Sequence, residues 1–305
     1  MQVLITGGAG YVGYSLVKQL LEDLDQVHSI TIFDNLSRKN YSFFTEAKFD
    51  HKPIVFIQGD ILDGRTLSNA LEGIDCVVHL AAKVTTPFAD HEAHFFDQIN
   101  HWGTAQLVNA IEKSDVKKVV YLSSMSVYGN HDIPLNERTE PTPTSFYGIS
   151  KLDGEKQLHT LRNSRELYII RSGNVYGYNP AYRIDAVINR FMFDAHFHNR
   201  IQINGSGEQS RSFIHVEKIA SYLAGAVDGK YEPGLYNAVE HNLSVNEIGG
   251  YMRSLYPTLE SIHVSFNINL RSVETELPVK LGSLYSLPDN DLESELKEFK
   301  SMFSF

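Results

Sequence analysis

Several things are scarce in this chain of 305 residues. Cys76 is its only cysteine, so no internal disulfide can form, which is compatible with a reducing compartment. No apolar run approaches the ~20 residues of a membrane span, and Met1 leads directly into a strand-like segment, leaving no room for a signal peptide. Low-complexity tracts and internal repeats are also missing.

Basic residues are outnumbered, with 27 Lys and Arg against 37 Asp and Glu, which gives a net charge of −10. An acidic balance of this size argues against nucleic-acid binding, because the phosphate backbone demands positive charge. An anionic ligand would have to be bound by a few local arginines, lysines and helix N-termini. The composition therefore predicts a cytoplasmic α/β protein with no nucleic-acid or membrane partner.

A glycine-rich segment follows the first predicted strand, residues 3–5, and precedes an apolar-periodic helix over residues 16–24. The glycines fit both common dinucleotide spacings, as Gly8, Gly10, Gly13 or as Gly7, Gly10, Gly13. Glycines allow a tight turn and close approach of a pyrophosphate, which then rests on the N-terminus of the helix. The order strand, glycine turn, helix predicts a dinucleotide site.

An acid stands where a ribose-binding carboxylate is expected. The next predicted strand, residues 29–33, ends at Asp34, about 20 residues past the last glycine. A carboxylate there binds the ribose 2′-hydroxyl and repels a 2′-phosphate, so NAD is favoured over NADP. Arg38 and Lys39 follow closely and moderate that preference.

Further strands alternate with helical segments. The predicted strand over 54–57 ends near Asp60, the strand over 76–80 ends near Ala81, and the strand over 119–122 ends at Ser123-Ser124. A helical segment over 92–113 separates the last two strands. Asp60 has two interpretations, either a contact with the adenine or the N-cap of a helix that starts near residues 63–64. The alternation predicts a doubly wound parallel sheet.

Downstream of the fifth strand, Tyr147 and Lys151 form a Tyr-x-x-x-Lys pattern. On a helix these positions lie on one face, so the ammonium can favour the phenolate form of the tyrosine. A phenol tuned in this way can exchange the proton that accompanies hydride transfer with a nicotinamide.

Together these motifs resemble the extended short-chain dehydrogenase/reductase superfamily, and within it the NAD-dependent nucleotide-sugar epimerases and dehydratases. The resemblance covers roughly residues 1 to 240. It rests on segments 6–13, 34–37, 59–61, 79–82, 123–129, 147–151, 171–177 and 211–216. It implies a Rossmann-type α/β fold, a doubly wound parallel sheet with a smaller C-terminal α/β lobe that binds the substrate.

The resemblance also implies roles for individual residues. Tyr147 would be the catalytic acid/base, Lys151 its pKa tuner, and Ser124 a hydrogen-bond partner of the reacting sugar oxygen. The implied NAD contacts are Gly7, Gly10, Tyr11, Val12, Gly13, Asp34, Asn35, Asp60, Ile61, Leu80, Ala81, Ala82, Asn100, Tyr147 and Lys151. The implied contacts to a nucleotide-diphosphate sugar are Ser124, Ser126, Tyr147, Asn174, Arg211 and Arg271.

Family dehydratases have an acid after the serine, whereas this chain has Met125 and Ser126. The pattern is similar to that of UDP-galactose 4-epimerase and favours epimerisation at C4 through a transient 4-keto sugar. A 4-keto reductase of a nucleotide-linked sugar would use the same residues and stays open, as does a non-catalytic dinucleotide-sensing protein. Ser212 stands where the galactose enzymes have an acid, so the substrate is the least determined feature.

We expect an NAD-binding domain over residues 1–172 and a substrate-binding lobe over 173–305, with the segment around 209–230 returning to the first domain. No histidine pair has a third ligand at a suitable spacing, so no metal is expected. The resemblance further implies a homodimer, in which the helix over 97–112 and the Tyr147 helix form a four-helix bundle. Val108, Ile111, Leu152 and Leu158 could line that bundle or face their own sheet.

Overall fold

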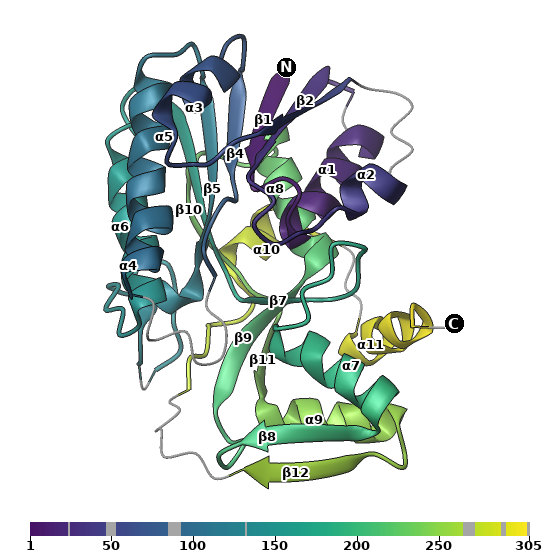
Figure 1. Ribbon diagram of the computed structural model, residues 1–305. Helices are drawn as coiled ribbons and strands as arrows, with labels where there is room; N and C mark the ends of the chain where they lie inside the picture. Colours follow the sequence, from purple (N-terminus) through teal and green to yellow (C-terminus); the bar gives the residue numbers. More distant parts are fainter. Residues whose placement is uncertain are drawn as a thin grey trace.

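The computed structural model describes residues 1–23, 25–46, 53–84, 93–131, 133–264, 272–287 and 291–303. Its centre is a seven-stranded sheet in the order β10-β6-β5-β4-β1-β2-β3, and every neighbouring pair is parallel (Figure 1). The strands are β1 (Gln2–Thr6), β2 (Ser29–Asp34), β3 (Ile54–Gln58), β4 (Cys76–His79), β5 (Lys118–Ser124), β6 (Glu166–Ser172) and β10 (Gly234–Ala238). The predicted doubly wound parallel sheet is confirmed.

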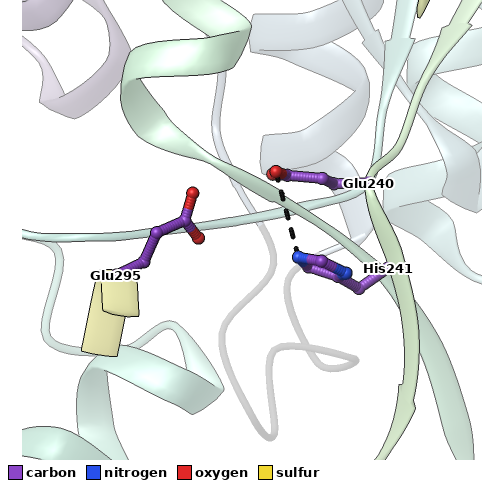
Figure 2. Close-up of side chains that lie close together, drawn as sticks. All are labelled: Glu240, His241 and Glu295. Atoms are coloured by element: carbon purple, nitrogen blue, oxygen red, sulfur yellow. Dashed lines mark ion pairs between the residues drawn. The ribbon is translucent and has the colours of Figure 1, made fainter. Parts of the chain in front are cut away.

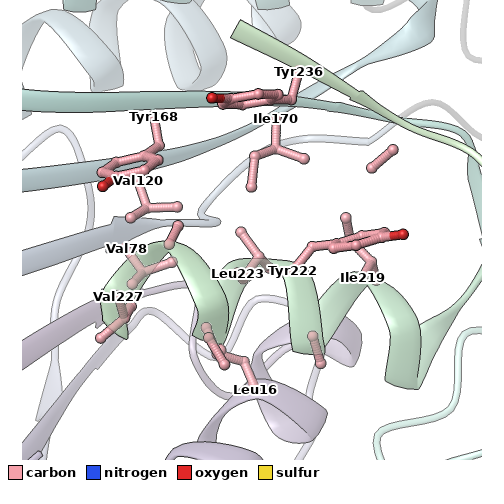
Figure 3. Close-up of a cluster of buried hydrophobic side chains, with 14 of the residues drawn as sticks. Leu16, Val78, Val120, Tyr168, Ile170, Ile219, Tyr222, Leu223, Val227 and Tyr236 are labelled. Atoms are coloured by element: carbon pink, nitrogen blue, oxygen red, sulfur yellow. The ribbon is translucent and has the colours of Figure 1, made fainter. Parts of the chain in front are cut away.

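Helices cover both faces of this sheet (Figure 1). On one face lie α1 (Tyr11–Asp23) and α8 (Val216–Asp228), and on the other lie α3 (Gly64–Ala70), α5 (Gly103–Glu112) and α6 (Phe146–His159). Figure 3 shows how α8 buries Ile219, Leu223 and Val227 toward the strands, opposite Val78 and Val120. Both faces are apolar because a parallel sheet is covered on both sides.

The helical segment predicted over 92–113 consists of three successive pieces. It begins as α4 (Ala93–Phe96), becomes a π-helix, η2 (Asp97–Trp102), and continues as α5. A short 3₁₀ turn, η3 (Met125–Tyr128), follows β5, and α2 (Ser42–Glu46) follows β2. π-Helical turns are rare and often occur at functional sites.

The second lobe combines two small sheets with helices around a separate apolar core. One sheet has the order β11-β9-β7, and in the other β12 pairs with β8. Its elements are β7 (Asn174–Tyr176), α7 (Val187–His198), β8 (Arg200–Asn204), β9 (Ser210–His215), β11 (His241–Ser244), α9 (Val245–Leu255), β12 (Glu260–Val264) and α11 (Leu292–Ser301). A short helix, α10 (Lys280–Leu284), lies beside β10 of the central sheet.

The domain boundary at residue 172 stays a prediction. Beyond it the chain returns to the first domain, because α8 packs against α1, β10 forms the edge of the central sheet beside β6, and α10 lies against β10. Among the described residues, no helix is both long enough and apolar enough to cross a membrane. The cytoplasmic location likewise stays a prediction.

Candidate active site

The glycine turn between β1 and α1 has a geometry that only glycine satisfies. Gly7 has φ +71°, and a Cβ built there would lie 2.6 Å from the backbone nitrogen of Ala81. A Cβ on Gly13 would lie 2.5 Å from the Gly8 carbonyl oxygen. Beside Gly10, by contrast, a Cβ would meet only the Gly7 carbonyl oxygen, at 3.1 Å. The turn is thus closely packed and lies at a helix N-terminus, where a pyrophosphate can bind.

Tyr11 opens α1, but its side chain turns away from the glycine turn. Its hydroxyl donates to the carbonyl oxygen of Gly177 at 2.5 Å and accepts from the amide of Asn189 at 3.2 Å. Burial raises the pKa of this phenol. The phenol of Tyr11 therefore binds the segment that follows β7, and a cofactor contact by the backbone N–H of Tyr11 or of Val12 stays a prediction.

The carboxylate of Asp34 lies at the end of β2, beside the glycine turn. It accepts the backbone N–H of Ala9 at 3.1 Å and that of Leu36 at 2.8 Å. Burial raises its pKa, and these two hydrogen bonds oppose the rise. The position fits the predicted ribose contact.

Asn35 and Asp60 meet at the neighbouring strand ends. The Asn35 amide donates to a carboxylate oxygen of Asp60 at 3.1 Å. The N-cap of α3 is Asp63, so the alternative interpretation of Asp60 as that cap is wrong. Ile61 is buried in the apolar core, so its side chain does not face a ligand.

Asn100, a predicted cofactor contact, makes several hydrogen bonds within the protein. Its side chain is 1% exposed, accepts from the Lys83 backbone N–H at 2.8 Å and donates to the Lys83 carbonyl oxygen at 2.9 Å. It also donates to the Ser150 hydroxyl at 3.0 Å. These bonds hold the backbone that follows Leu80, Ala81 and Ala82 against α6. Asn100 therefore fixes the position of this backbone, which belongs to the predicted cofactor site.

Tyr147, Ser124 and Lys151 come together where β5 and α6 meet. Ser145 caps α6 by accepting the backbone N–H of Gly148 at 3.1 Å, so that the helix begins at Phe146, one residue before Tyr147. The Ser124 hydroxyl donates to that of Ser126 at 3.2 Å, and the Ser124 side chain lowers the pKa of Tyr147. The predicted catalytic serine and tyrosine therefore interact electrostatically.

Lys151 lies beneath this pair, but its ammonium points elsewhere. Its Nζ donates to the carbonyl oxygen of Leu122 at 2.7 Å and lies 4.1 Å from the ring centroid of Tyr121. Burial lowers the pKa of Lys151 to about 7, opposed by the nearby Glu155. The lysine side chain is thus held by a carbonyl and an aromatic face, a cation–π contact.

The charge that acts on Tyr147 comes from an unexpected residue. Burial raises the pKa of Tyr147, the positive charge of Arg183 lowers it, and the hydrogen bond from Ser124 lowers it further. The sequence assigned that charge effect to Lys151, and this role of Lys151 stays a prediction. Lys151 is buried against the strand, whereas Arg183 belongs to the segment between β7 and α7.

The predicted substrate residues Asn174 and Arg211 lie on neighbouring strands of the second lobe. The Asn174 amide donates to the Ser212 carbonyl oxygen at 3.1 Å, and Arg211 donates to the Ser210 carbonyl oxygen at 2.8 Å. Burial lowers the pKa of Arg211. Arg271 lies outside the described residues.

A buried ion pair that the sequence did not indicate supports the site from below. Arg171 on β6 and Glu155 on α6 form two hydrogen bonds, at 2.6 and 3.0 Å, with both side chains at most 4% exposed. The Ser123 hydroxyl donates to the same carboxylate at 2.5 Å. The only signal in the sequence was the position of Glu155, one helical turn after Lys151 on the same face.

One group of possible metal ligands occurs among the described residues, formed by Glu240, His241 and Glu295 (Figure 2). Their ligand atoms all lie within 4.8 Å of one another. Lys218 already pairs with Glu240, and the Tyr176 hydroxyl donates to Glu295. The Lys218 ammonium and the Tyr176 hydroxyl thus already bind these two carboxylates, and the cluster connects α11 to the strands of the second lobe.

The model of the NAD-dependent epimerase/dehydratase family matches residues 3–238. The chain belongs to this family. NAD is the family's cofactor, and the glycine turn and the Asp34 carboxylate fit it.

Relatives within the family include both chemistries. The mouse dTDP-D-glucose 4,6-dehydratase is 34% identical, over 77% of this chain and 67% of that protein. An uncharacterised UDP-glucose epimerase of Bacillus subtilis is 31% identical, over 75% of this chain and 73% of that protein. The structure of a UDP-N-acetylglucosamine 4-epimerase from Methanobrevibacter ruminantium has a TM-score of 0.85 and 27% identity, covering 99% of this chain and 97% of that one.

Proposed function

We propose that this family member is a nucleotide-sugar 4-epimerase. The observation that supports this most is that the two residues after Ser124, Met125 and Ser126, which the structure describes, are not acids. The residue after Ser124, Met125, is 5% exposed and packs in the core. The next, Ser126, uses its hydroxyl to accept from Ser124. Elimination of water, as in a 4,6-dehydratase, would require a further acid and base at these positions.

In the proposed reaction Tyr147 transfers the proton, and the other side chains bind the substrate. NAD, when bound, would supply the acceptor for a hydride from the sugar carbon and the donor for its return. The Tyr147 phenolate accepts the proton of the sugar 4-hydroxyl, while Ser124 donates a hydrogen bond to that oxygen. After the 4-keto sugar has presented its other face, Tyr147 gives the proton back. Asn174 and Arg211 would retain the diphosphate throughout, so the keto sugar stays tethered.

The first test is the dinucleotide content of the purified protein, released by denaturation and identified chromatographically. An epimerase returns its hydride within each turnover and has no need to exchange NAD, so we expect about one NAD per chain. Empty sites that accept added NADH would instead indicate a 4-keto reductase. A protein that binds no dinucleotide would contradict the proposal altogether.

The second test replaces Tyr147 by Phe and measures interconversion of UDP-sugars. Turnover should fall by at least a hundredfold, the usual contribution of a general acid/base, while NAD stays bound. Tyr251, in the core of the second lobe, provides the matched control, and Tyr251→Phe should retain activity. Unchanged turnover in Tyr147→Phe would refute the mechanism.

We also infer a homodimer, from apolar side chains that the helices leave exposed. Trp102 is 53% exposed on η2, and Phe146 and Ile149 are 46% and 41% exposed on α6, which packs against η2. Three of the predicted interface residues are instead buried, since Val108, Ile111 and Leu158 lie in the chain's own core. Leu152 also packs against its own core. Light scattering on wild type and Trp102→Glu tests this, and a monomeric wild type would refute it.

A further inference from the structure

The segment between β7 and α7, residues 177–186, is attached to several elements on the cofactor side. Figure 1 shows it passing below α1. Its Asn179 amide donates to the Tyr11 carbonyl oxygen at 2.9 Å and to the Ser15 hydroxyl at 3.0 Å. Near α2, the Ser42 hydroxyl donates to the carbonyl oxygen of Pro180 at 2.6 Å. This segment of the second lobe therefore has a fixed position beside the turns that form the cofactor site.

Asp185 in this segment lies between two arginines. Its carboxylate accepts two hydrogen bonds from the Arg183 guanidinium, from Nε to Oδ1 at 3.1 Å and from Nη2 to Oδ2 at 3.4 Å. Its Oδ2 is also 3.8 Å from Nη1 of Arg38. The Asp185 side chain is 19% exposed and that of Arg38 is 53% exposed.

Arg38 belongs to the turn that carries the ribose-binding acid. It follows Asp34 by four residues, and the Lys39 N–H donates to the Leu36 carbonyl oxygen at 2.8 Å to close the turn. Leu36 and Lys39 both have positive φ, 55° and 53°, so the turn has a defined shape. An arginine at this place is what accommodates the 2′-phosphate of NADP in dinucleotide-binding folds.

We propose that Asp185 is a specificity-determining residue that, by pairing with Arg38, prevents this arginine from binding a 2′-phosphate and so reinforces selection of NAD. Asp34 repels the 2′-phosphate directly, and Asp185 neutralises the only arginine of the adjoining turn. The sequence left the NAD preference moderate because of Arg38, and the structure supplies a counter-charge 147 positions later in the chain. The inference concerns cofactor choice alone and does not depend on the sugar or on the reaction.

The test measures the ratio of the dissociation constants for NADP⁺ and NAD⁺ by competitive displacement of bound nucleotide. In Asp185→Asn, affinity for NADP⁺ should rise by about two- to fivefold, the range for loss of one exposed ion pair, with affinity for NAD⁺ unchanged. Asp153→Asn, which breaks an exposed ion pair with Lys156 on α6, is the matched control and should change neither constant.

A double-mutant comparison separates the two arginines that share Asp185. The gain in NADP⁺ affinity should vanish in Asp185→Asn/Arg38→Gln and persist in Asp185→Asn/Arg183→Gln. A gain that survives removal of Arg38, or an unchanged NADP⁺ affinity in Asp185→Asn, would overturn the proposal. Should Asp185→Asn fold poorly, Asp185→Ser with the same readout replaces it. Because the measurement is of binding, it is independent of whether the protein is an epimerase.

Discussion

The stability of the protein should increase with pH above neutrality because of Lys151. This lysine is 2% exposed, and burial lowers its pKa from 10.5 to about 7. Between these two values the unfolded chain binds a proton that the folded chain does not. Folding is therefore opposed by the cost of removing that proton, and the cost shrinks as pH rises toward 10.5.

The magnitude follows from the pKa difference. Below pH 7 both states are protonated, and the penalty is constant at roughly 5 kcal/mol. Between pH 7 and pH 9 about 2 kcal/mol of this penalty disappears. Lys151→Met carries no titrating group at this position, so the wild type should gain about 2 kcal/mol relative to this variant over the same interval.

Urea unfolding of both proteins at pH 6, 7, 8 and 9, without added nucleotide, measures this difference directly. Other titrating groups contribute equally to the two proteins and cancel in the comparison. Lys156→Met changes an exposed lysine of the same helix and keeps Lys151, so the difference in stability between wild type and this variant should not change from pH 7 to 9. A wild-type minus Lys151→Met difference that stays flat from pH 7 to 9 would mean that the folded protein retains a charged lysine, and the reasoning would fail.

Three further changes have defined outcomes. Arg171→Met should leave the buried Glu155 carboxylate uncompensated and lower the free energy of unfolding by about 3–5 kcal/mol. Calorimetry should show this as a fall in Tm of roughly 5–8 °C. The double variant with Glu155→Met should recover most of this stability, and no recovery would contradict a buried-charge penalty. Gly7→Ala should abolish the rise in Tm on adding NAD, because its Cβ would clash with the backbone after β4. Gly250→Ala, where a Cβ meets nothing within 4 Å, should leave that rise intact. Arg183→Met should move the acidic limb of the pH–rate profile to higher pH, because the cation that lowers the pKa of the catalytic tyrosine is removed, whereas Arg183→Lys should not; an unmoved limb in Arg183→Met would refute this role.

The part of the site that the sequence predicted consists of residues whose roles depend on local geometry. The glycine turn, Asp34 and the Tyr147 helix each lie in one short segment, where spacing alone determines which groups face together. Apolar periodicity likewise predicted the parallel strands and α8.

The contacts that sequence reasoning missed depend on packing between distant segments. Lys151 was expected to act on Tyr147 because both lie on one helix face, but the carbonyl of Leu122 and the ring of Tyr121, both on β5, compete for its ammonium. Arg183 belongs to no motif, and only the folding of the second lobe over α1 brings it near Tyr147. Side-chain contacts across about thirty or more positions have no periodic signature, so spacing could not reveal them.

The electrostatics of the site suggest different roles for Lys151 and Arg183. Burial raises the pKa of Tyr147 and lowers that of Lys151, so the enclosed site favours the neutral forms of both groups. A lysine whose pKa is about 7 can take up or release a proton at neutral pH, which a permanently charged group cannot. The positive charge of Arg183 lowers the pKa of Tyr147. We therefore expect Arg183 to favour the phenolate form in which Tyr147 can act as a base.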